Sequence, residues 1–524
     1  MTPTVRPLLP LTPPSSYASI ADSESNRPKF SRELGCNELS YFLPSRADGV
    51  NDMYLHLSFQ APPELVSLQR IHAIWAIQRL RHPLLASRVS TGPDVSCARF
   101  EYDMPTTTDE AIQLAALESF FTSSSKDDLL FDYLNGPRLL SASRTSFLIV
   151  ARDPEQKNKW HLMVCAMHCI GDGMALHTCA NEILFLFGVG GGVDELRQVL
   201  DLELSKMNGL PRSMEVALPA LPSGFKRAVG MVDDKLLAAK QIGGHSFPKA
   251  KGATRKTVVP TVSFDEEQTK KILARCKANG VSVSSAIFAL CNIAWAKLLS
   301  RGTVNAQMGA KLPTLMYSAL NTRPWSDQIS KNESFFRLNI GYFNVILPSF
   351  LPSDSTSAHR AFWHRARLAK AQSAAAVKSP FIISRTQITA RKREEQAIKW
   401  AKIDDEEAAM RTGLLTPAST PTDEQPPALP SVPKPNPTPS AALMGLSLLG
   451  NLDGMYKHAS YGPIKLDGLT TGSRQRAGGM LLFSYTFIGK LWLCFGYDEN
   501  GVERRVVEEF WKEVVGGVDE MLGA

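Results

Sequence analysis

A histidine, an aspartate and two glycines stand close together in residues 160–177, WHLMVCAMHCIGDGMALH. His168 ends an apolar run, and Asp172 follows four residues later between Gly171 and Gly173. Because the ordinary pKa of imidazole is near 6.5, a histidine can take and return a proton near neutral pH. An aspartate beyond a tight turn can pair with an arginine and hold the loop that presents the histidine. The pattern indicates a general base, His168, with Asp172 in a positioning role.

Other interpretations fit these residues by themselves. A histidine at a strand end is often a hydrogen-bonded core residue with no part in chemistry. Cys165 and Cys169 lie near His168 and Asp172, which permits a metal site, although no second pair of ligands occurs at zinc spacing. The chain has no G-x-S-x-G segment, which counts against a serine hydrolase of that type.

The elements that position His168 follow from the apolar pattern around it. Residues 139–153 and 159–168 read as two strands of a hairpin, joined by the polar turn PEQKNK. The stretch after Gly173 has helical spacing, so the motif is predicted at a strand–turn–helix junction. We expect Gly171 and Gly173 to allow backbone angles that other residues resist.

The remaining periodicities predict further strands and helices of an α/β protein. Strands are expected at 53–60, 257–264, 316–324 and 341–348, with a hairpin at 481–498. Helices are expected at 63–80, 265–280 and 284–299 and from residue 502 to the end. No repeat of solenoid type is present.

Composition shifts divide the chain into segments. Residues 1–28 are rich in Pro and Ser and are predicted to be disordered. An N-terminal lobe over 29–200, a crossover over 201–255 and a C-terminal lobe over 256–524 follow. Within the last, residues 403–440 read as a mobile Pro-rich insertion.

The bulk composition is that of a globular enzyme. The chain has 524 residues, of which 44% are hydrophobic and 21% charged. A net charge of +7 suits a polyanionic small ligand, but no dense basic stretch with interleaved aromatics indicates nucleic acid. The one basic run, Arg391-Lys392-Arg393, precedes Glu394-Glu395 and is interpreted as a solvated helix face.

Cysteine usage and apolar runs bear on location. The eight cysteines are scattered and form no disulfide framework, which favours a reducing compartment. The N-terminus lacks a signal-peptide core, and the apolar run at 183–193 is too short and glycine-rich to span a bilayer. We therefore expect a cytoplasmic protein without a membrane span.

Several segments, in order, resemble the coenzyme A-dependent acyltransferase superfamily, which includes chloramphenicol acetyltransferase, plant BAHD enzymes and peptide-synthetase condensation domains. The H-x-x-x-D-G pattern at His168–Gly173 is similar to the active-site motif of that superfamily. The other similar segments are IWAIQRLRHPLLASRV, KANGVSVSSAIFALCNIAWAKLL, SALNTRP, GYFNVILP and GKLWLCFGYDEN. The resemblance runs from about residue 32 to the end, without the Pro-rich insertion.

The resemblance implies two chloramphenicol-acetyltransferase-like α/β lobes, each a mixed sheet with helices, and a channel between them. It implies that His168 is the general base and that Asp172 is structural and held by an arginine, with Gly173 allowing the turn. Arg323 is the first candidate for that arginine and Arg81 the second.

Further site residues implied by the resemblance are Asn344, Ser473 and Ser484, as polar side chains of the substrate channel. A turn or strand role fits each of the three as well. The implied activity is acyl transfer, most simply of acetyl, from acyl-CoA as co-substrate to a hydroxyl of a hydrophobic small molecule. No permanently bound cofactor and no metal are implied, and a monomer suffices because both lobes lie in one chain.

Within the superfamily, residues 447–492 are most similar to fungal acetyltransferases of secondary metabolism, of the trichothecene 15-O-acetyltransferase type. That similarity favours a terpenoid alcohol as acceptor. Met167 stands where condensation domains usually have a second histidine, and the plant-type D-F-G-W-G motif is absent. A condensation-like enzyme with a carrier-bound donor and a non-catalytic binding protein remain alternatives. The sequence does not name the acceptor, the acyl length or the residues that bind the coenzyme A phosphates.

Overall fold

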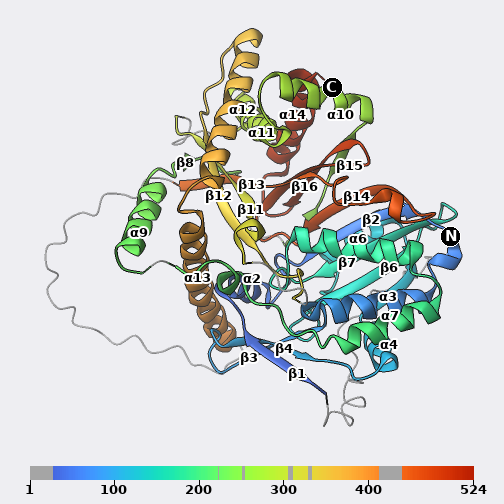
Figure 1. The fold of residues 1–524 in the computed structure, drawn as a ribbon. Helices are drawn as coiled ribbons and strands as arrows, with labels where there is room; N and C mark the ends of the chain where they lie inside the picture. Colours follow the sequence, from blue (N-terminus) through green and yellow to red (C-terminus); the bar gives the residue numbers. More distant parts are fainter. Residues whose placement is uncertain are drawn as a thin grey trace, which may run out of the picture.

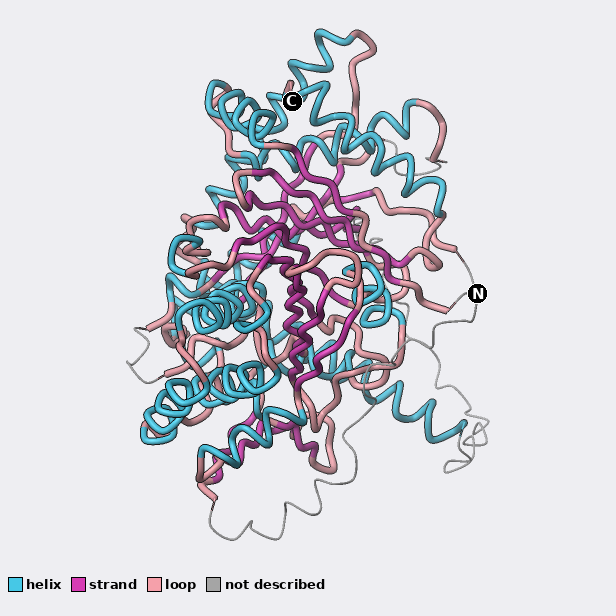
Figure 2. The backbone as a smooth tube through the Cα atoms, turned by 90° about the vertical axis from the view of Figure 1, so that its right-hand side faces the viewer, coloured by secondary structure: helices cyan, strands magenta, loops and turns pink. Residues whose placement is uncertain are grey.

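The computed structural model describes residues 27–221, 223–250, 254–304, 311–327, 333–411 and 440–523. The chain folds into two α/β lobes, one above the other in Figure 1. In the turned view of Figure 2, strands occupy the centre and helices lie around them. The expected two-lobed fold class with mixed sheets is confirmed. Nearly all of the segment 1–28 lies outside the described residues.

The N-terminal lobe contains a five-stranded sheet. Its strands, in spatial order, are β14 (Lys465–Ser473), β2 (Met53–Gln60), β7 (Lys159–Ala166), β6 (Ser146–Arg152) and β5 (Ser119–Ser123). Helices of this lobe are α3 (Leu68–Arg81), α4 (Thr108–Leu117), α5 (Lys126–Asn135), α6 (Gly173–Val189) and α7 (Val193–Ser205). Strand β14 belongs to this sheet although its residues fall in the range expected for the C-terminal lobe, because it pairs antiparallel with β2.

The C-terminal lobe is built on an eight-stranded sheet. Its main path is β10 (Thr261–Phe264), β16 (Lys490–Asp498), β15 (Met480–Phe487), β13 (Ser440–Asn451), β11 (Thr314–Asn321) and β12 (Ile340–Leu347). The short strands β8 (Gly243–Gly244) and β9 (Thr257–Val258) pair with β13 and β16. Helices α10 (Glu266–Ala278), α11 (Val283–Ser300), α12 (Ser355–Val377) and α14 (Arg504–Leu522) lie above this sheet in Figure 1.

A separate three-stranded sheet consists of β1 (Lys29–Glu33), β4 (Ala98–Asp103) and β3 (Arg88–Thr91) and lies at the bottom of Figure 1. The remaining helices are α2 (Cys36–Ser45), α8 (Met214–Ala217), α9 (Gly224–Ala239) and α13 (Ile382–Arg411), of which α2 and α9 both contact α13. Helices α2 and α13 run side by side (Figure 1).

The insertion predicted over 403–440 starts too early, because residues 403–411 are the last turns of α13. Residues 412–439 lie outside the described residues.

Local capping explains where one predicted helix differs from the structure. The sequence predicts a helix over 63–80, whereas α3 begins at Leu68 after a single 3₁₀ turn at Pro63–Leu65. The Ser67 side chain accepts a hydrogen bond from the Arg70 amide, so Ser67 is the N-cap that starts the regular helix.

One described helix, α11, is long and apolar enough to cross a membrane by length and composition. Its most apolar window is 72% buried inside the protein. Ile287, Leu290 and Trp295 of α11 belong to the core of the C-terminal lobe. The apolar composition of α11 is thus accounted for by packing against the sheet.

Candidate active site

His168 lies in the turn between β7 and α6. The Met167 amide donates to the Thr145 carbonyl at 2.9 Å, which extends the pairing of β7 with the chain before β6. The Ile170 amide then donates to the Met167 carbonyl at 3.1 Å and closes a turn around His168. The predicted strand–turn–helix junction is present, and it holds the His168 backbone between two regular elements.

Asp172 caps helix α6 and is itself buried. Its carboxylate accepts the Ala175 amide at 3.1 Å, which makes Asp172 the N-cap of the helix. The same carboxylate accepts the Asn339 amide at 2.8 Å, from the segment that leads into β12 of the other lobe. Asp172 thus fixes the start of α6 and ties it to the C-terminal lobe.

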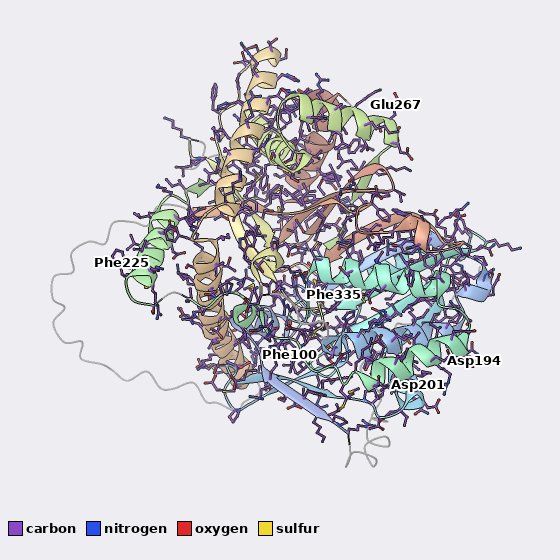
Figure 3. The ribbon with its side chains drawn as sticks, viewed as in Figure 1. Phe100, Asp194, Asp201, Phe225, Glu267 and Phe335 are labelled. Carbon is purple, nitrogen blue, oxygen red and sulfur yellow. The ribbon has the colours of Figure 1, made fainter. Side chains whose placement is uncertain are left out.

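Arg323 completes this link between the lobes. Its Nη1 lies 3.0 and 2.9 Å from the two Asp172 carboxylate oxygens, and its Nη2 donates to the Arg337 carbonyl at 2.8 Å. Phe335, whose carbonyl lies 3.4 Å from the same Nη2, stands between the two lobes in Figure 3. The structure therefore brings Asp172 and Arg323 together. The second candidate, Arg81, binds Glu203 at 2.8 Å instead.

The two glycines of the motif differ from expectation. Neither Gly171 nor Gly173 has a positive φ, so the predicted backbone freedom is used at neither position. A Cβ on Gly171 would lie 2.7 Å from the ring of the fully buried Phe336, whereas the nearest atom to a Cβ on Gly173 is 3.7 Å away. Close packing accounts for glycine at 171. The expectation that Gly173 allows the turn is wrong, because a side chain has room at position 173 and other residues adopt the same φ range.

The environment of His168 keeps its imidazole neutral. Burial lowers the pKa of His168 to about 4, although backbone contacts of His168 and Gly171 and the Asp172 carboxylate act in the opposite direction. The Nδ1 atom is buried and has no side-chain partner, and Nε2 has no hydrogen-bond partner among the described residues. A neutral imidazole with a free lone pair at pH 7 is suited to accept a proton.

Three residues that the sequence analysis missed form a group beside the imidazole, which they reach through Tyr41. The Tyr41 ring of α2 stacks on the His168 ring with centroids 4.0 Å apart and planes 18° apart. Its hydroxyl hydrogen-bonds that of Tyr342 in β12. The Arg393 guanidinium of α13 lies over both tyrosine rings, with Cζ 4.9 Å and 4.7 Å from their centroids. We call Tyr41, Tyr342 and Arg393 the aromatic–arginine group.

Arg393 contradicts the prediction of a solvated face for the basic run. Arg391 and Lys392 are exposed, but Arg393 is partly buried and points toward α2. It shares a helix face with the buried residues Thr386, Ala390 and Ala397, as their spacing of three or four residues shows. That stripe of small residues is the signal from which this orientation can be predicted.

The cation–π contacts offset only part of the cost of placing this charge. Such contacts contribute about 0.5–2 kcal/mol, whereas the desolvation of a buried ion costs several kcal/mol. Among the described residues, the Arg393 guanidinium interacts with two hydroxyl groups, that of Ser40, which lies 3.4 Å from Nε, and that of Tyr41, and it has no carboxylate partner. Such partners usually accompany a buried charge.

The three predicted channel residues make no hydrogen bond or ring contact with this group among the described residues, although Asn344 lies two residues after Tyr342 in β12. Asn344 of β12 donates to the Gln241 side chain at 2.6 Å, and the Ser473 hydroxyl, at the end of β14, accepts from Gln475 at 3.3 Å. Ser484 is buried in β15. Among the described residues, no hydrogen bond or ring contact joins Asn344, Ser473 or Ser484 to His168. Their channel roles stay predictions, as does the channel itself.

The cysteines near the motif are protonated thiols. Burial raises the pKa values of Cys165 and Cys169, which disfavours the thiolate that metals bind. In the part of the chain that the structure covers, no three His, Cys, Asp or Glu side chains gather in a group that could hold a metal. All eight cysteines are free.

Comparison with known proteins gives matches in structure alone, since no family model and no curated protein matches the sequence. The trichothecene 15-O-acetyltransferase TRI3 from Fusarium sporotrichioides aligns with a TM-score of 0.69 at 13% identity, over 94% of this chain and 95% of that one. The first condensation domain of the calcium-dependent antibiotic synthetase aligns with a TM-score of 0.59 at 10% identity, over 94% and 97%. SgcC5 from Streptomyces globisporus gives 0.55 at 11% identity, over 94% and 99%. The chain therefore has the two-lobed fold that coenzyme A-dependent acyltransferases and condensation domains share.

Proposed function

We propose that this protein is an acyl-CoA-dependent O-acyltransferase in which His168 is the general base. The observation that supports this most is a neutral imidazole whose Nε2 has no hydrogen-bond partner among the described residues, on a loop that the Asp172–Arg323 pair holds where the two lobes meet. The fold shared with TRI3 and with condensation domains supports the same reaction class. The acyl group is most simply acetyl, and the acceptor a hydrophobic alcohol such as a terpenoid of secondary metabolism.

The reaction follows from the chemistry of an imidazole beside a hydroxyl. Nε2 takes the hydroxyl proton as the oxygen attacks the thioester carbonyl carbon, which forms the C–O bond and a tetrahedral oxyanion. The intermediate collapses and the C–S bond breaks. The imidazolium returns its proton to the departing thiolate, so the products are an ester and free coenzyme A. Asp172 pairs with Arg323 and holds the loop, and it takes no part in the proton transfer.

The first experiment titrates the purified protein calorimetrically with acetyl-CoA and with free coenzyme A. We expect wild type and His168→Ala to bind acetyl-CoA with similar affinity. In a subsequent thiol-release assay with a panel of alcohols, His168→Ala should be slower by about 10²–10⁴-fold. If His168→Ala turns over at the wild-type rate, the general base assignment is wrong.

A donor bound to a carrier protein is the second candidate, because condensation domains share the fold. That candidate predicts no binding of acetyl-CoA or longer acyl-CoAs, and transfer only from an acylated carrier domain. Binding without turnover of any donor would favour a non-catalytic binding protein. Met167 before His168, where condensation domains usually have histidine, favours the free thioester.

We also propose that the protein acts as a cytoplasmic monomer, with acyl-CoA and a small-molecule alcohol as its only partners. Eight free cysteines suit a reducing compartment, and both lobes of the site come from one chain. Light scattering of the purified protein checks the oligomeric state, with a mass near 57.5 kDa expected.

A further inference from the structure

Arg393 is a cation near the proposed general base, and no carboxylate of the described residues pairs with it. Among the described residues it forms no salt bridge, and its neighbours are two tyrosine rings and the Ser40 hydroxyl. Burial raises the pKa of Tyr342 well above its ordinary value, so this hydroxyl is neutral and supplies no charge. An arginine held in this way can donate two parallel hydrogen bonds to the oxygens of an anion.

A second arginine, Arg476, adds positive charge near Arg393. Arg476, an exposed residue after β14, acts on Tyr342 and on Tyr317 of β11. Burial raises the pKa values of Tyr317 and Tyr342, and the charges of Arg393 and Arg476 oppose that rise at both. No carboxylate is among the main electrostatic influences on either ring. The charged side chains that act on both Tyr317 and Tyr342 are therefore the two arginines.

Arg393 lies closer to His168 than the phosphates of an extended coenzyme A would. The His168 ring centre lies 4.0 Å from the Tyr41 centroid, and Arg393 Cζ lies 4.9 Å from it, so the imidazole and Cζ are at most about 9 Å apart. The pantetheine arm between thioester and pyrophosphate, when extended, is as long as about four extended residues, roughly 14 Å. With its thioester at His168 and this arm extended, coenzyme A would place its phosphates beyond Arg393. This distance favours an anion at the reacting end of a substrate.

We propose that the aromatic–arginine group of Tyr41, Tyr342 and Arg393 binds a carboxylate carried by one of the two reacting groups. The carboxylate forms a bidentate pair with the guanidinium, and the substrate's carbon chain passes the edge of the Tyr41 ring, whose faces are covered by His168 and Arg393. Its source is either the acceptor, which is then a hydroxy acid, or the acyl group, which is then a dicarboxylic half-thioester. This inference rests on the proposed function, because it takes His168 as the reacting centre.

The test compares ligands that differ in a carboxylate. In the acyl arm, succinyl-CoA is compared with butyryl-CoA, which has the same number of acyl carbons. In the acceptor arm, 10-hydroxydecanoate is compared with its methyl ester in the presence of coenzyme A. Calorimetric binding is measured for wild type, Arg393→Gln and Arg393→Lys. Arg391→Gln, which changes an exposed arginine two residues earlier on the same helix, is the matched control.

We expect wild type to prefer the carboxylate in one arm by about 10- to 100-fold, the range of a charge-assisted hydrogen bond. The arm that shows the preference identifies the source. Arg393→Gln should lose the preference, Arg393→Lys should keep part of it, and Arg391→Gln should keep all of it. If circular dichroism shows that Arg393→Gln is misfolded, Arg393→Met replaces it, since its stem packs on the tyrosines in the same way.

Equal binding within both wild-type pairs, or a preference that survives in the neutral Arg393 variant, would overturn the carboxylate site. Either result would leave the proposed function standing if butyryl-CoA binds and His168-dependent transfer to neutral alcohols is observed. Conversely, a carboxylate preference without any His168-dependent transfer would support the anion site and refute the proposed function.

Discussion

Replacing Arg323 with methionine should weaken the contact between the lobes and leave the buried Asp172 carboxylate without its arginine partner. The Asp172 side chain is 3% exposed, whereas that of Arg323 is 19% exposed. Arg323→Met removes both contacts of Nη1 with the carboxylate but leaves the two backbone amides of Ala175 and Asn339. Removing one partner of a buried pair costs about 3–5 kcal/mol, and we expect a loss of that size in the free energy of unfolding.

The assay combines urea unfolding with hydrogen exchange at the lobe interface. The Asn339 amide donates to Asp172, so its exchange rate reports opening of this contact without requiring two-state unfolding of a large chain. Arg323→Met should speed exchange in the peptide that contains Asn339. A double-mutant cycle with Asp172→Asn, which keeps an N-cap side chain, should give a coupling of at least about 1.5 kcal/mol.

Arg138→Met supplies the matched control. Arg138 binds Asp52 through two nitrogens at 2.7 and 3.0 Å, and the pair is as buried as Arg323–Asp172, with 15% and 1% exposure. The control should destabilise the protein similarly and leave exchange at Asn339 and the activity of the folded protein unchanged. A coupling below about 0.5 kcal/mol, or equal exchange at Asn339 in both variants, would refute the role of Asp172–Arg323 as the lobe link.

The pH profile of kcat/KM should rise as His168 loses its proton, near pH 4, and stay level at neutral pH, because burial disfavours the protonated ring; a midpoint near 6.5 would contradict this. Gly171→Ala should cost about 1–3 kcal/mol of unfolding free energy because its Cβ meets the buried Phe336 ring, while Gly173→Ala should change it by less than about 1 kcal/mol. Thermal unfolding of both variants measures the contrast, and equal losses would refute it. Cys169→Ala should keep acetyl-CoA binding, measured by calorimetry. Stoichiometric zinc in the wild-type protein, together with a severe loss of acetyl-CoA binding in the variant, would favour the metal interpretation instead.

Much of the fold could be predicted because it depends on patterns within short segments. Alternating and helical periodicity placed the strand at 53–60, the helix α11 and the closing hairpin close to their observed bounds. The strand–turn–helix junction around His168 is likewise a local matter of an apolar strand, a turn and the N-cap Asp172. The predicted start of a helix was wrong where an N-cap residue sets it, as Ser67 does for α3. The residues before Ser67 suit either a separate turn or the first turn of a helix.

Which distant residues meet at the site depended on the tertiary structure, except where a family resemblance supplied the pairing, as for Arg323. Tyr41, Tyr342 and Arg393 come from three elements about 50 to 300 residues apart, and no local pattern relates them. The sequence by itself determined the side chains that can carry charge or protons and their local backbone. Their pKa values, their partners and the space around each glycine were decided by packing, because burial and proximity are properties of the folded chain.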